Sequence, residues 1–330
     1  MKEILSSVIG GQVLSEAEAA FALRQILAGE IPAAQSAAFL TMMQMRGLNL
    51  SELRGFVAVL HESGTKIDLP ETELIDVCGT GGDGKNTFNI STLAAFVLAG
   101  ANFKVAKHGN SSATSGCGSS DVLRVLGIEF TNDEKVLRRQ LECANICYLH
   151  APLFQPALKT VATLRREIGF RTFFNLLGVL LNPARPRFQL IGVADPAVMR
   201  LYRYFLEDSG QEFALVHARD GYDEISLTSA FDAVTNRGAA SFYPEDLGYQ
   251  TGAPDQLQSG ETAEENARQF LQILQNQGTT TQNSVVTANA AFAMHLIKPE
   301  FSFEECRARA EESLLSGAAS GAFELLRATK

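Results

Sequence analysis

IDVCGTGGDGKNTFNISTLAAFVLAGANFKVAKHGNSSATSGCGSSD, residues 75–121, is the stretch that decides the fold. A short apolar run, residues 74–77, predicts a buried strand, and glycines follow at positions 79, 81, 82 and 84. Glycine tolerates positive φ and lets a ligand approach bare backbone, and the N–H groups of such a loop can converge on an anion. The stretch therefore predicts a strand that ends in an anion-binding glycine loop.

Polar residues follow the loop where a helix is expected to begin. Residues 86–92 lead into an apolar helix over Leu93–Ala99, whose N-terminus offers free N–H groups and a positive dipole end. A second strand, Phe103–Ala106, ends at Lys107–Asn110, and a small-residue loop over 111–120 precedes a helix that opens at Asp121. Two strand ends thus bring polar loops to one edge of a parallel sheet, where open α/β sheets bind ligands.

The glycine loop matches neither common nucleotide motif. It lacks the Gly-Lys-Ser/Thr ending of a P-loop, and its G-x-G-x-x-G spacing lacks the acidic residue that closes the next strand of a dinucleotide site. A glycine-rich turn alone is as often structural as phosphate-binding, but such a turn does not need Asn89, Ser91 and Lys107. These three residues favour the phosphate-binding interpretation.

In these motifs the chain resembles the anthranilate phosphoribosyltransferases. The signature loops are GTGGDG at 79–84, NIST at 89–92 and KHGN at 107–110. Later segments agree in order: RTFFNLLG at 171–178, NPA at 182–184 and DGYDEIS at 220–226. The likeness covers nearly the whole chain. The first motif is specific, whereas the others would be weak alone.

Residue patterns and the resemblance together predict a two-domain α/β protein. Residues 1–69 read as three short helices, which indicates a helical domain, and strands alternate with helices from residue 74 onward. We expect residues 70–330 to form the α/β phosphoribosyl-binding domain, and residues 151–156 to form a loop. The resemblance implies the nucleoside phosphorylase/phosphoribosyltransferase fold, with a central mostly parallel sheet. It also implies a hinge, an active-site cleft and a helical return at about 155–180.

Composition argues against several classes of protein. The net charge is −9 without a cluster of Lys or Arg, which makes nucleic acid an unexpected partner. No apolar run approaches the ~20 residues of a membrane span, and no signal-peptide pattern follows Met1. The five cysteines are scattered without a zinc pattern, so we expect reduced thiols in the cytoplasm.

The resemblance implies transfer of the 5-phosphoribosyl group of phosphoribosyl pyrophosphate to the amine of anthranilate, with release of pyrophosphate, in tryptophan biosynthesis. No covalent nucleophile is expected, and the chain has no convincing Ser-His-Asp or Cys-His set. The residues that the resemblance assigns to phosphoribosyl pyrophosphate are Gly79, Gly82, Asp83, Thr87, Asn89, Ser91, Thr92, Lys107 and Ser119.

The resemblance also implies Mg²⁺, two ions per subunit, with Ser91, Asp223 and Glu224 as ligands. Mg²⁺ takes hard oxygen ligands and is commonly shared between carboxylates and substrate phosphates. Adjacent side chains of a regular strand face opposite ways, so the two carboxylates converge only in an irregular turn. Gly221 makes such a turn plausible.

Contacts to anthranilate are implied for Gly79, His108, Asn110 and Arg165. Arg165 is chosen by aligning residues 164–169 with the family pattern, and an alignment shifted by one residue would assign Arg166 instead. His108 could alternatively have only a structural role. Three residues depart from the family pattern near the acceptor side: Ser111, where many members have Arg, Gln155, where His is common, and Val179, where Pro is common.

Two other functions stay open, together with the oligomeric state. Pyrimidine nucleoside phosphorylases look similar and use a related Lys-His-Gly-Asn loop, but they need no pyrophosphate site. A non-catalytic relative that binds nucleic acid is the second alternative, and the net charge argues against it. We also expect a homodimer through the N-terminal helices, because the apolar faces Leu23/Ile26/Leu27 and Phe56/Val57/Leu60 exceed what a small domain buries well.

Overall fold

The computed structural model describes residues 1–70, 72–111 and 117–330. The chain divides into two compact units. Residues 1–66 and 151–185 form the first, called the helical unit, and residues 67–150 and 186–330 form the second, called the α/β unit.

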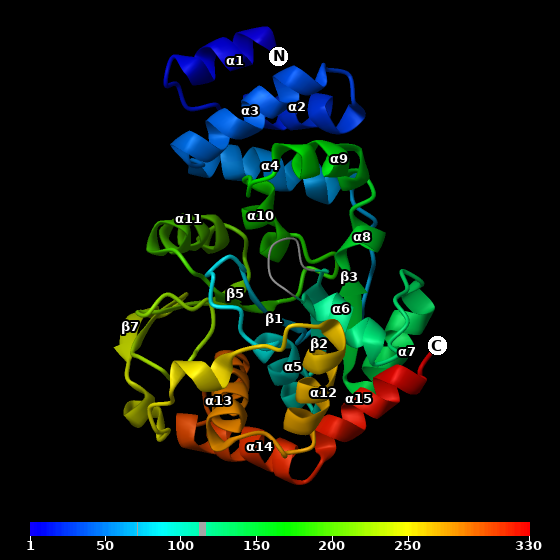
Figure 1. The fold of residues 1–330 in the computed structure, drawn as a ribbon, viewed down its shortest axis with the longest axis vertical. Helices are drawn as coiled ribbons and strands as arrows, with labels where there is room; N and C mark the ends of the chain where they lie inside the picture. The colour runs from blue at the N-terminus through cyan, green and yellow to red at the C-terminus, as the bar shows by residue number, and fades with distance from the viewer. Residues whose placement is uncertain (71, 112–116) are drawn as a thin grey trace. The chain divides into compact units, whose positions relative to one another are not determined.

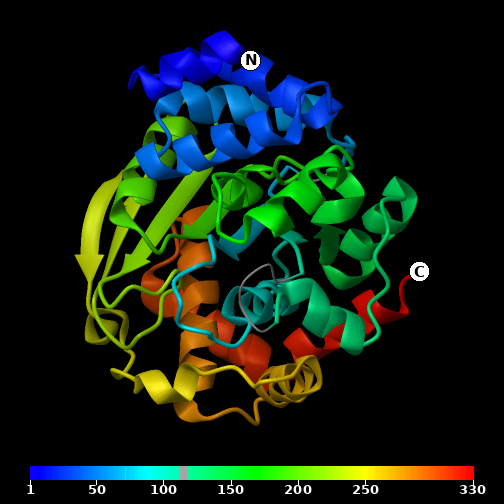
Figure 2. The same cartoon turned by 45° about the horizontal axis from the view of Figure 1, so that its top comes forward.

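The helical unit combines four N-terminal helices with a later return of the chain (Figures 1 and 2). Its elements are α1 Lys2–Ile9, α2 Glu16–Ala28, α3 Ala33–Arg46, α4 Leu50–Ser63, α8 Ala151–Phe154, α9 Leu158–Ile168, α10 Phe174–Leu177 and η1 Gly178–Leu180. Ser15 caps α2 in a capping box with Glu18, as its sequence predicts. Two expectations were wrong: there are four N-terminal helices rather than three, and α8 occupies most of the expected 151–156 loop.

An aromatic cluster joins the return of the chain to the N-terminal helices. The rings of Phe56 and Phe173 stack with centroids 4.4 Å apart, and Phe39 meets both rings edge-on. All three side chains are almost fully buried. Residues more than a hundred positions apart therefore share one core, because each covers apolar surface that the other would leave in water.

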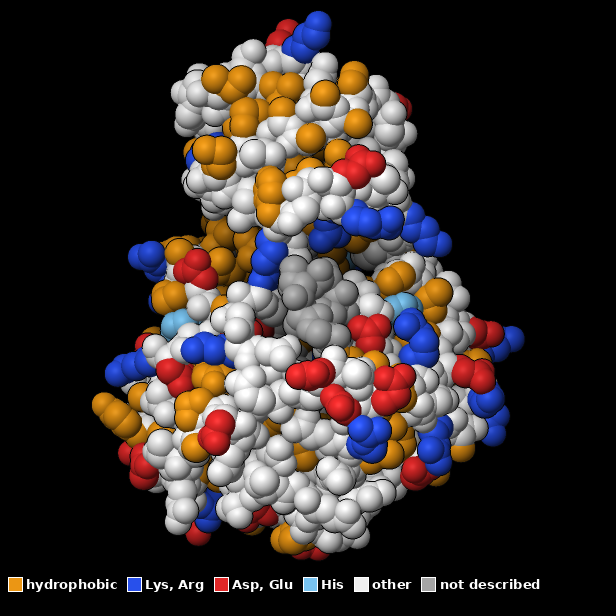
Figure 3. Space-filling view, viewed as in Figure 1, with side chains coloured by type: hydrophobic (Ala, Val, Ile, Leu, Met, Phe, Trp, Pro, Cys, Tyr) orange, Lys and Arg blue, Asp and Glu red, His pale blue; other side chains and the backbone are white. Residues whose placement is uncertain are grey.

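The apolar faces that motivated the homodimer lie inside this unit. Leu23, Ile26, Leu27, Phe56, Val57 and Leu60 are all buried in the single chain. The stated reason for a dimer was therefore wrong, because the chain itself covers these faces. Different hydrophobic side chains are exposed on the N-terminal segment, namely Ile9, Val13, Phe21 and Met45, and Figure 3 shows hydrophobic side chains on the visible face of this unit.

The α/β unit is built on a seven-stranded sheet in the order β3-β2-β1-β4-β5-β6-β7. The strands are β1 Ile75–Gly79, β2 Val105–Gly109, β3 Ile146–His150, β4 Phe188–Gly192, β5 Glu212–Ala218, β6 Phe231–Thr235 and β7 Gly238–Phe242. The first five strands run parallel, and β6 and β7 add an antiparallel hairpin at one edge. The expected mostly parallel sheet is confirmed.

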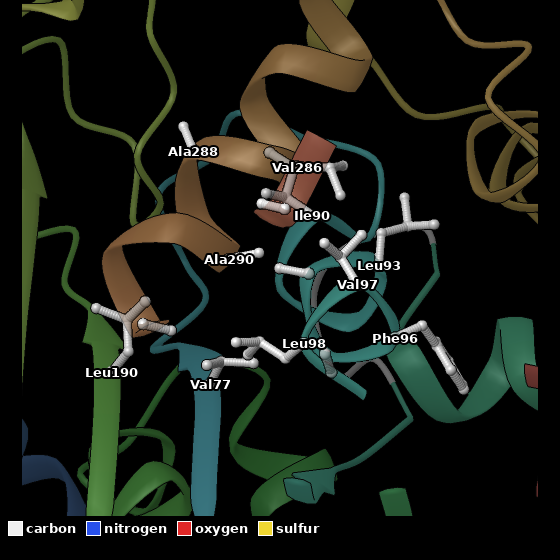
Figure 4. Packing of buried hydrophobic residues seen from close by; sticks show 14 of the residues in the cluster. Val77, Ile90, Leu93, Phe96, Val97, Leu98, Leu190, Val286, Ala288 and Ala290 are labelled. Atoms are coloured by element: carbon white, nitrogen blue, oxygen red, sulfur yellow. The ribbon is translucent and has the colours of Figure 1, made fainter. Parts of the chain in front are cut away.

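Helix α5, Ile90–Gly100, is the centre of the core of the α/β unit. Its residues 92–99 are all buried, and Figure 4 shows Leu93, Val97 and Leu98 beside side chains of β1, β4 and α13. A helix buried on all sides is expected to be apolar, and the sequence of α5 is apolar from Leu93 to Ala99. At Gly100 an added Cβ would lie 2.4 Å from Ser313 Oγ, so only glycine allows this close packing.

The other helices of the α/β unit follow strands or close the C-terminal part. They are α6 Ser119–Val125, α7 Glu134–Ala144, α11 Pro196–Glu207, η2 Pro244–Leu247, η3 Pro254–Leu257, α12 Ala263–Leu274, α13 Thr280–Ile297, α14 Phe303–Leu315 and α15 Ala318–Ala328. Helix α6 begins two residues before the expected Asp121, and half of the loop expected over 111–120, namely 112–116, lies outside the described residues. Among the helices of the described ranges, none has both the length and the apolar character for a membrane span.

Replacing Phe56 with Ala tests the shared core of the helical unit. The substitution removes the ring that stacks on Phe173, and large-to-small changes of this kind cost about 3–5 kcal/mol of unfolding free energy. Phe21→Ala is the control, because Phe21 is 49% exposed and surface changes stay within about 0.5 kcal/mol. Urea denaturation of both variants measures the difference, and equal losses would contradict the shared core.

Candidate functional site

Two glycines at the carboxyl ends of neighbouring strands make room for the turn at residues 220–226, called the acidic turn. Gly79 ends β1, Gly192 ends β4, and the two residues pair with each other. An added Cβ on Gly79 would lie 2.3 Å from Asp223 Oδ2, and one on Gly192 would lie 1.7 Å from the backbone oxygen of Asp223. The residues around Asp223 therefore pack directly on bare backbone, and any larger residue at either strand end would displace them.

The acidic turn is irregular, as the convergence of its two carboxylates requires. Gly221 has φ +92°, a conformation that favours glycine, and its N–H donates to Ala218 O. Beyond the carboxylates, Asn289 of α13 accepts a hydrogen bond from Ile225 N and donates one to Ile225 O. Asn289 is a buried amide in an apolar helix, and it holds the exit of the turn in place.

Asp223 and Glu224 each accept a backbone N–H group that precedes or opens α5. Asp223 Oδ2 accepts from Gly81 N at 2.6 Å, and Glu224 Oε1 accepts from Ser91 N at 3.3 Å. Ser91 lies in the first turn of α5, where N–H groups have no helical partner. The structure thus brings the acidic turn together with the glycine loop and the start of α5, which lie more than 130 residues earlier in the chain.

Burial and nearby negative charge raise the pKa of both carboxylates. Burial raises the pKa of Asp223 well above its ordinary value, and the negative charges of Glu224 and Asp83 raise it further. Burial raises the pKa of Glu224 to about 7, against the lowering effects of Ser91 and Lys107. Removing two carboxylates from water disfavours their charged forms, so this edge of the sheet needs positive charge.

The rest of the glycine loop is open and is anchored at its far end. Gly81, Gly82 and Gly84 all have positive φ, and an added Cβ on Gly81 or Gly84 would meet nothing within 4 Å. Asp83 Oδ1 accepts from Lys85 N, while its buried Oδ2 has no hydrogen-bond partner among the described residues. Phe88 N donates to Leu257 O, which ties the end of the loop to η3.

The remaining residues predicted for phosphoribosyl pyrophosphate lie on nearby segments of the same unit. Thr87 forms an isolated bridge with Gln258, Asn89 is the N-cap of α5, and Thr92 is buried in its first turn. Lys107 is buried in the middle of β2, where its Nζ donates to His108 O at 3.0 Å. Ser119 opens α6.

The residues predicted for anthranilate divide between the two units. In the α/β unit, His108 is buried and its backbone N–H donates to Asp76 Oδ1. Asn110 is exposed and follows β2. In the helical unit, Arg165 lies over the ring of Phe174 and its Nη2 donates to Asn175 Oδ1 at 3.4 Å. Burial lowers the pKa of Arg165.

Arg165 and its neighbour Arg166 differ in surroundings. Arg166 is exposed, whereas Arg165 is held against the segment 173–175 of its own unit. Of the three residues that depart from the family pattern, Gln155 and Val179 are buried in the helical unit, and Ser111 is partly buried after β2. The two buried departures thus belong to the same unit as Arg165.

Sequence reasoning missed Asn289 and Gly192. Asn289 was a single amide within the apolar run VVTANAAFAM, residues 285–294, and a buried amide in such a run signals a polar task. Gly192 lies at the end of a predicted strand, which is where backbone meets a ligand or loop. Neither position indicated its partner, because the acidic turn is about 30 residues from Gly192 and about 65 from Asn289.

In the described part of the chain, neither a metal-binding cluster of protein side chains nor the cavity beside β5 marks the predicted site. No group of three or more His, Cys, Asp or Glu side chains suited to hold a metal ion occurs in the described part of the chain. A cavity of about 340 Å³ lies at the amino end of β5, lined by Glu212, Thr235 and Phe292 among others, and none of the predicted site residues lines it. The glycine loop and the acidic turn follow the carboxyl ends of the strands, opposite this cavity.

Comparisons with known proteins agree with this layout. Residues 71–320 match the family "Glycosyl transferase family, a/b domain", and residues 2–64 match its helical bundle domain. The chain is 47% identical to an anthranilate phosphoribosyltransferase of Cytophaga hutchinsonii, covering 98% of each protein, and 47% identical to that of Bacteroides thetaiotaomicron, covering 97% and 96%.

Solved structures extend the comparison. The structure of the Thermus thermophilus anthranilate phosphoribosyltransferase is similar with a TM-score of 0.91, at 33% identity, covering 99% of this chain and 98% of that one. The Saccharomyces cerevisiae enzyme in complex with phosphoribosyl pyrophosphate and Mg has the same fold, with a TM-score of 0.90 at 24% identity, covering 98% and 96%.

The raised pKa of Glu224 predicts a pH-dependent cost to stability. The folded-state pKa is about 7 and the ordinary value is 4.5, so between these pH values the folded state holds more protons than the unfolded state. The unfolding free energy therefore falls as pH rises through this window, by up to about 3 kcal/mol. Glu224→Gln keeps an acceptor for Ser91 N–H and should stabilise the protein at pH 8 but hardly at pH 4.5.

Urea denaturation at the two pH values, with a chelator present, measures this effect. Glu207→Gln is the matched control, because Glu207 is an exposed partner of Arg203 and should show no such pH dependence. Equal effects of Glu224→Gln at both pH values would show that Glu224 does not hold the extra proton.

Proposed function

The chain belongs to the anthranilate phosphoribosyltransferase family of glycosyl transferases, and from that premise we propose how its own residues perform the transfer. The reaction moves the 5-phosphoribosyl group of phosphoribosyl pyrophosphate to the amine of anthranilate and releases pyrophosphate, in tryptophan biosynthesis. The observation that carries the proposal is the convergence of Asp223 and Glu224 on the glycine loop and the first turn of α5.

The glycine loop and its neighbours hold the phosphates in this proposal. Gly79, Gly82, Asp83, Thr87, Asn89, Ser91, Thr92, Lys107 and Ser119 form the binding set for phosphoribosyl pyrophosphate. Unfilled space beside Gly81 and Gly84 supports it, because phosphate oxygens can approach bare backbone there. The buried ammonium of Lys107 supplies positive charge against the leaving pyrophosphate, whose charge grows in the transition state.

Mg²⁺ fits the donor set at the acidic turn. Asp223 is buried and Glu224 is partly buried, their raised pKa values indicate too little local positive charge, and Asp83 Oδ2 is a buried oxygen without a partner in the described residues. We propose Asp223, Glu224 and Ser91 as ligands of two ions per subunit. Mg²⁺ commonly takes only one or two protein carboxylates together with substrate phosphates, which fits the lack of a larger protein cluster. When bound, it neutralises the charge of the pyrophosphate.

The acceptor half of the proposal uses Gly79, His108, Asn110 and Arg165. The Arg165 guanidinium is planar and suited to a carboxylate, and its position against Phe174 and Asn175 limits its freedom before anthranilate binds. The chain supplies no covalent nucleophile in this account. Its residues hold the anthranilate amine in line with the ribose carbon, and this positioning can supply a large part of the rate enhancement.

Product analysis separates this function from the nucleoside phosphorylases. Incubation with phosphoribosyl pyrophosphate, Mg²⁺ and a panel of aromatic amines should give the phosphoribosyl adduct of anthranilate and pyrophosphate. Robust phosphorolysis of thymidine or uridine, without transfer to anthranilate, would overturn the proposal. The names of the relatives and the acidic turn beside the glycine loop both support the transferase.

A homodimer and a cytoplasmic location stay predictions. The faces of α2 and α4 are buried within the chain, so we propose that the dimer forms through exposed hydrophobic side chains instead. These include Ile9, Phe21 and Met45. Light scattering at micromolar concentration measures the mass, and a monomer would contradict the dimer.

Removing the two carboxylates should impair the chemical step. In the variant with Asp223→Asn and Glu224→Gln, we expect kcat to fall roughly a hundredfold or more, because the leaving pyrophosphate loses its neutralisation. Asp232→Asn is the control, since Asp232 is an exposed partner of Arg219 and belongs to none of the proposed binding sets. Steady-state kinetics with Mg²⁺ varied separately measures the effect, and an unchanged kcat would remove both residues from the site.

Removing the Arg165 side chain should weaken the binding of anthranilate. A hydrogen bond to a charged group is worth about 1.5–3 kcal/mol, so Arg165→Ala should raise KM for anthranilate roughly ten- to a hundredfold. The effect on kcat should be smaller, because the carboxylate is remote from the reacting amine. Arg166→Ala is the matched control. If Arg166→Ala alone raised this KM, the assignment would be shifted by one residue.

A further inference from the structure

A continuous chain of hydrogen bonds connects the end of β3 to Ser119. His150 Nδ1 lies 2.8 Å from Ser120 Oγ, Ser120 Oγ lies 2.8 Å from Tyr148 Oη, and Tyr148 Oη lies 2.8 Å from Ser119 Oγ. Ser119 Oγ continues with a longer contact, 3.4 Å, to Asn110 O. The function proposed above uses Ser119 and Asn110 but gives no task to Tyr148, Ser120 or His150, all three of which are buried.

The sheet brings these side chains together. Tyr148 and His150 are two residues apart on β3, so their side chains lie on one face, and they pair with Lys107 and Gly109 of β2. An added Cβ on Gly109 would lie 2.2 Å from Tyr148 Oη and 2.5 Å from Ser119 Oγ. Glycine at position 109 therefore lets the phenol reach Ser119 across the end of β2.

Aromatic packing fixes both rings at the start of the chain of hydrogen bonds. The ring of Phe130 stacks on His150 with centroids 4.5 Å apart and lies 5.2 Å from Tyr148. Arg124 covers the Phe130 ring from a distance of 5.4 Å. The imidazole and the phenol are thus held in position before a substrate arrives, which is the requirement for a positioning role.

One order of donors satisfies every bond of the chain, including the contact with Asn110. The carbonyl of Asn110 only accepts, so in this order Ser119 donates its single proton there. Tyr148 then donates to Ser119, Ser120 to Tyr148, and the Nδ1–H of His150 to Ser120. Burial raises the pKa of Tyr148 to about 12, which keeps the phenol protonated as this order requires.

We propose that Tyr148 and His150 are positioning residues that turn the Ser119 hydroxyl into a dedicated donor for a phosphate oxygen of phosphoribosyl pyrophosphate. The inference rests on the proposed function, which assigns Ser119 to this substrate. Because Tyr148 fills the acceptor side of Ser119, the only proton of Ser119 points away from the phenol. Its bond to Asn110 O is long and therefore weak, so a phosphate oxygen can replace this acceptor at little cost. Each donor in the chain also strengthens the next.

Tyr148→Phe tests the proposal because it removes only the hydroxyl and keeps the ring beside Phe130. KM for phosphoribosyl pyrophosphate should rise roughly three- to tenfold, the usual worth of one hydrogen bond, while KM for anthranilate stays unchanged. Tyr249→Phe is the matched control. It removes another buried phenol hydroxyl, bonded to Thr287 Oγ1 at 3.3 Å, and should change neither KM.

A double-mutant cycle with Ser119→Ala separates positioning from general support of the fold. If Tyr148 acts through Ser119, the double variant has the same KM for phosphoribosyl pyrophosphate as Ser119→Ala alone. His150→Phe, which keeps an aromatic ring against Phe130, should raise this KM less than Tyr148→Phe and should have no effect in the Ser119→Ala background. Additive effects in either cycle would overturn the proposal.

The same experiment distinguishes failure of the inference from failure of the proposed function. If Ser119→Ala leaves KM for phosphoribosyl pyrophosphate unchanged, the assignment of Ser119 is wrong and the inference falls with it. If Ser119→Ala raises this KM and Tyr148→Phe does not, only the inference is wrong. If Tyr148→Phe does not fold, Ser120→Ala replaces it, since it cuts the chain between His150 and Tyr148, and an unchanged KM would overturn the proposal.

Discussion

The packing of the turn that carries Asp223 and Glu224 on the bare ends of β1 and β4 is the constraint on which the α/β unit depends. Gly79 and Gly192 must lack side chains because the backbone and side chain of Asp223 occupy the space of their Cβ atoms. Asn289 then holds the exit of the turn, and the first turn of α5 meets Glu224. Strand register, helix placement and turn geometry all serve to place two negative charges together.

This arrangement is costly for the folded protein without its ligands. Burial raises the pKa of both carboxylates, and the charge of Glu224 raises that of Asp223 further, so the site holds protons that an exposed pair would release. A chain selected for stability alone would place apolar or amide groups here. The electrostatic cost is instead consistent with a site completed by cations and phosphates, because their charges complement those that the protein supplies.

The sequence predicted the local elements well and the long-range convergence poorly. Glycine spacing and the capping box of Ser15 with Glu18 are local signals, and the strands and helices follow them within a few residues. The meeting of Asp223 with Gly81 joins residues 142 positions apart, and no periodicity encodes such a distance. That part of the site came from resemblance to a family. The clamp by Asn289 and the chain from His150 to Ser119 were missed for the same reason. Burial of the α2 and α4 faces was also misjudged, because an apolar face does not say whether its own chain or a second copy covers it.

The most direct test is to locate a divalent cation in crystals of the protein soaked with phosphoribosyl pyrophosphate and Mn²⁺, using the anomalous scattering of manganese. Mn²⁺ favours the same hard oxygen ligands as Mg²⁺. The account predicts an anomalous peak bonded to a carboxylate oxygen of Asp223 or Glu224 and to a phosphate oxygen of the substrate. Manganese held by the substrate alone, with both carboxylates remote from it, would contradict the account.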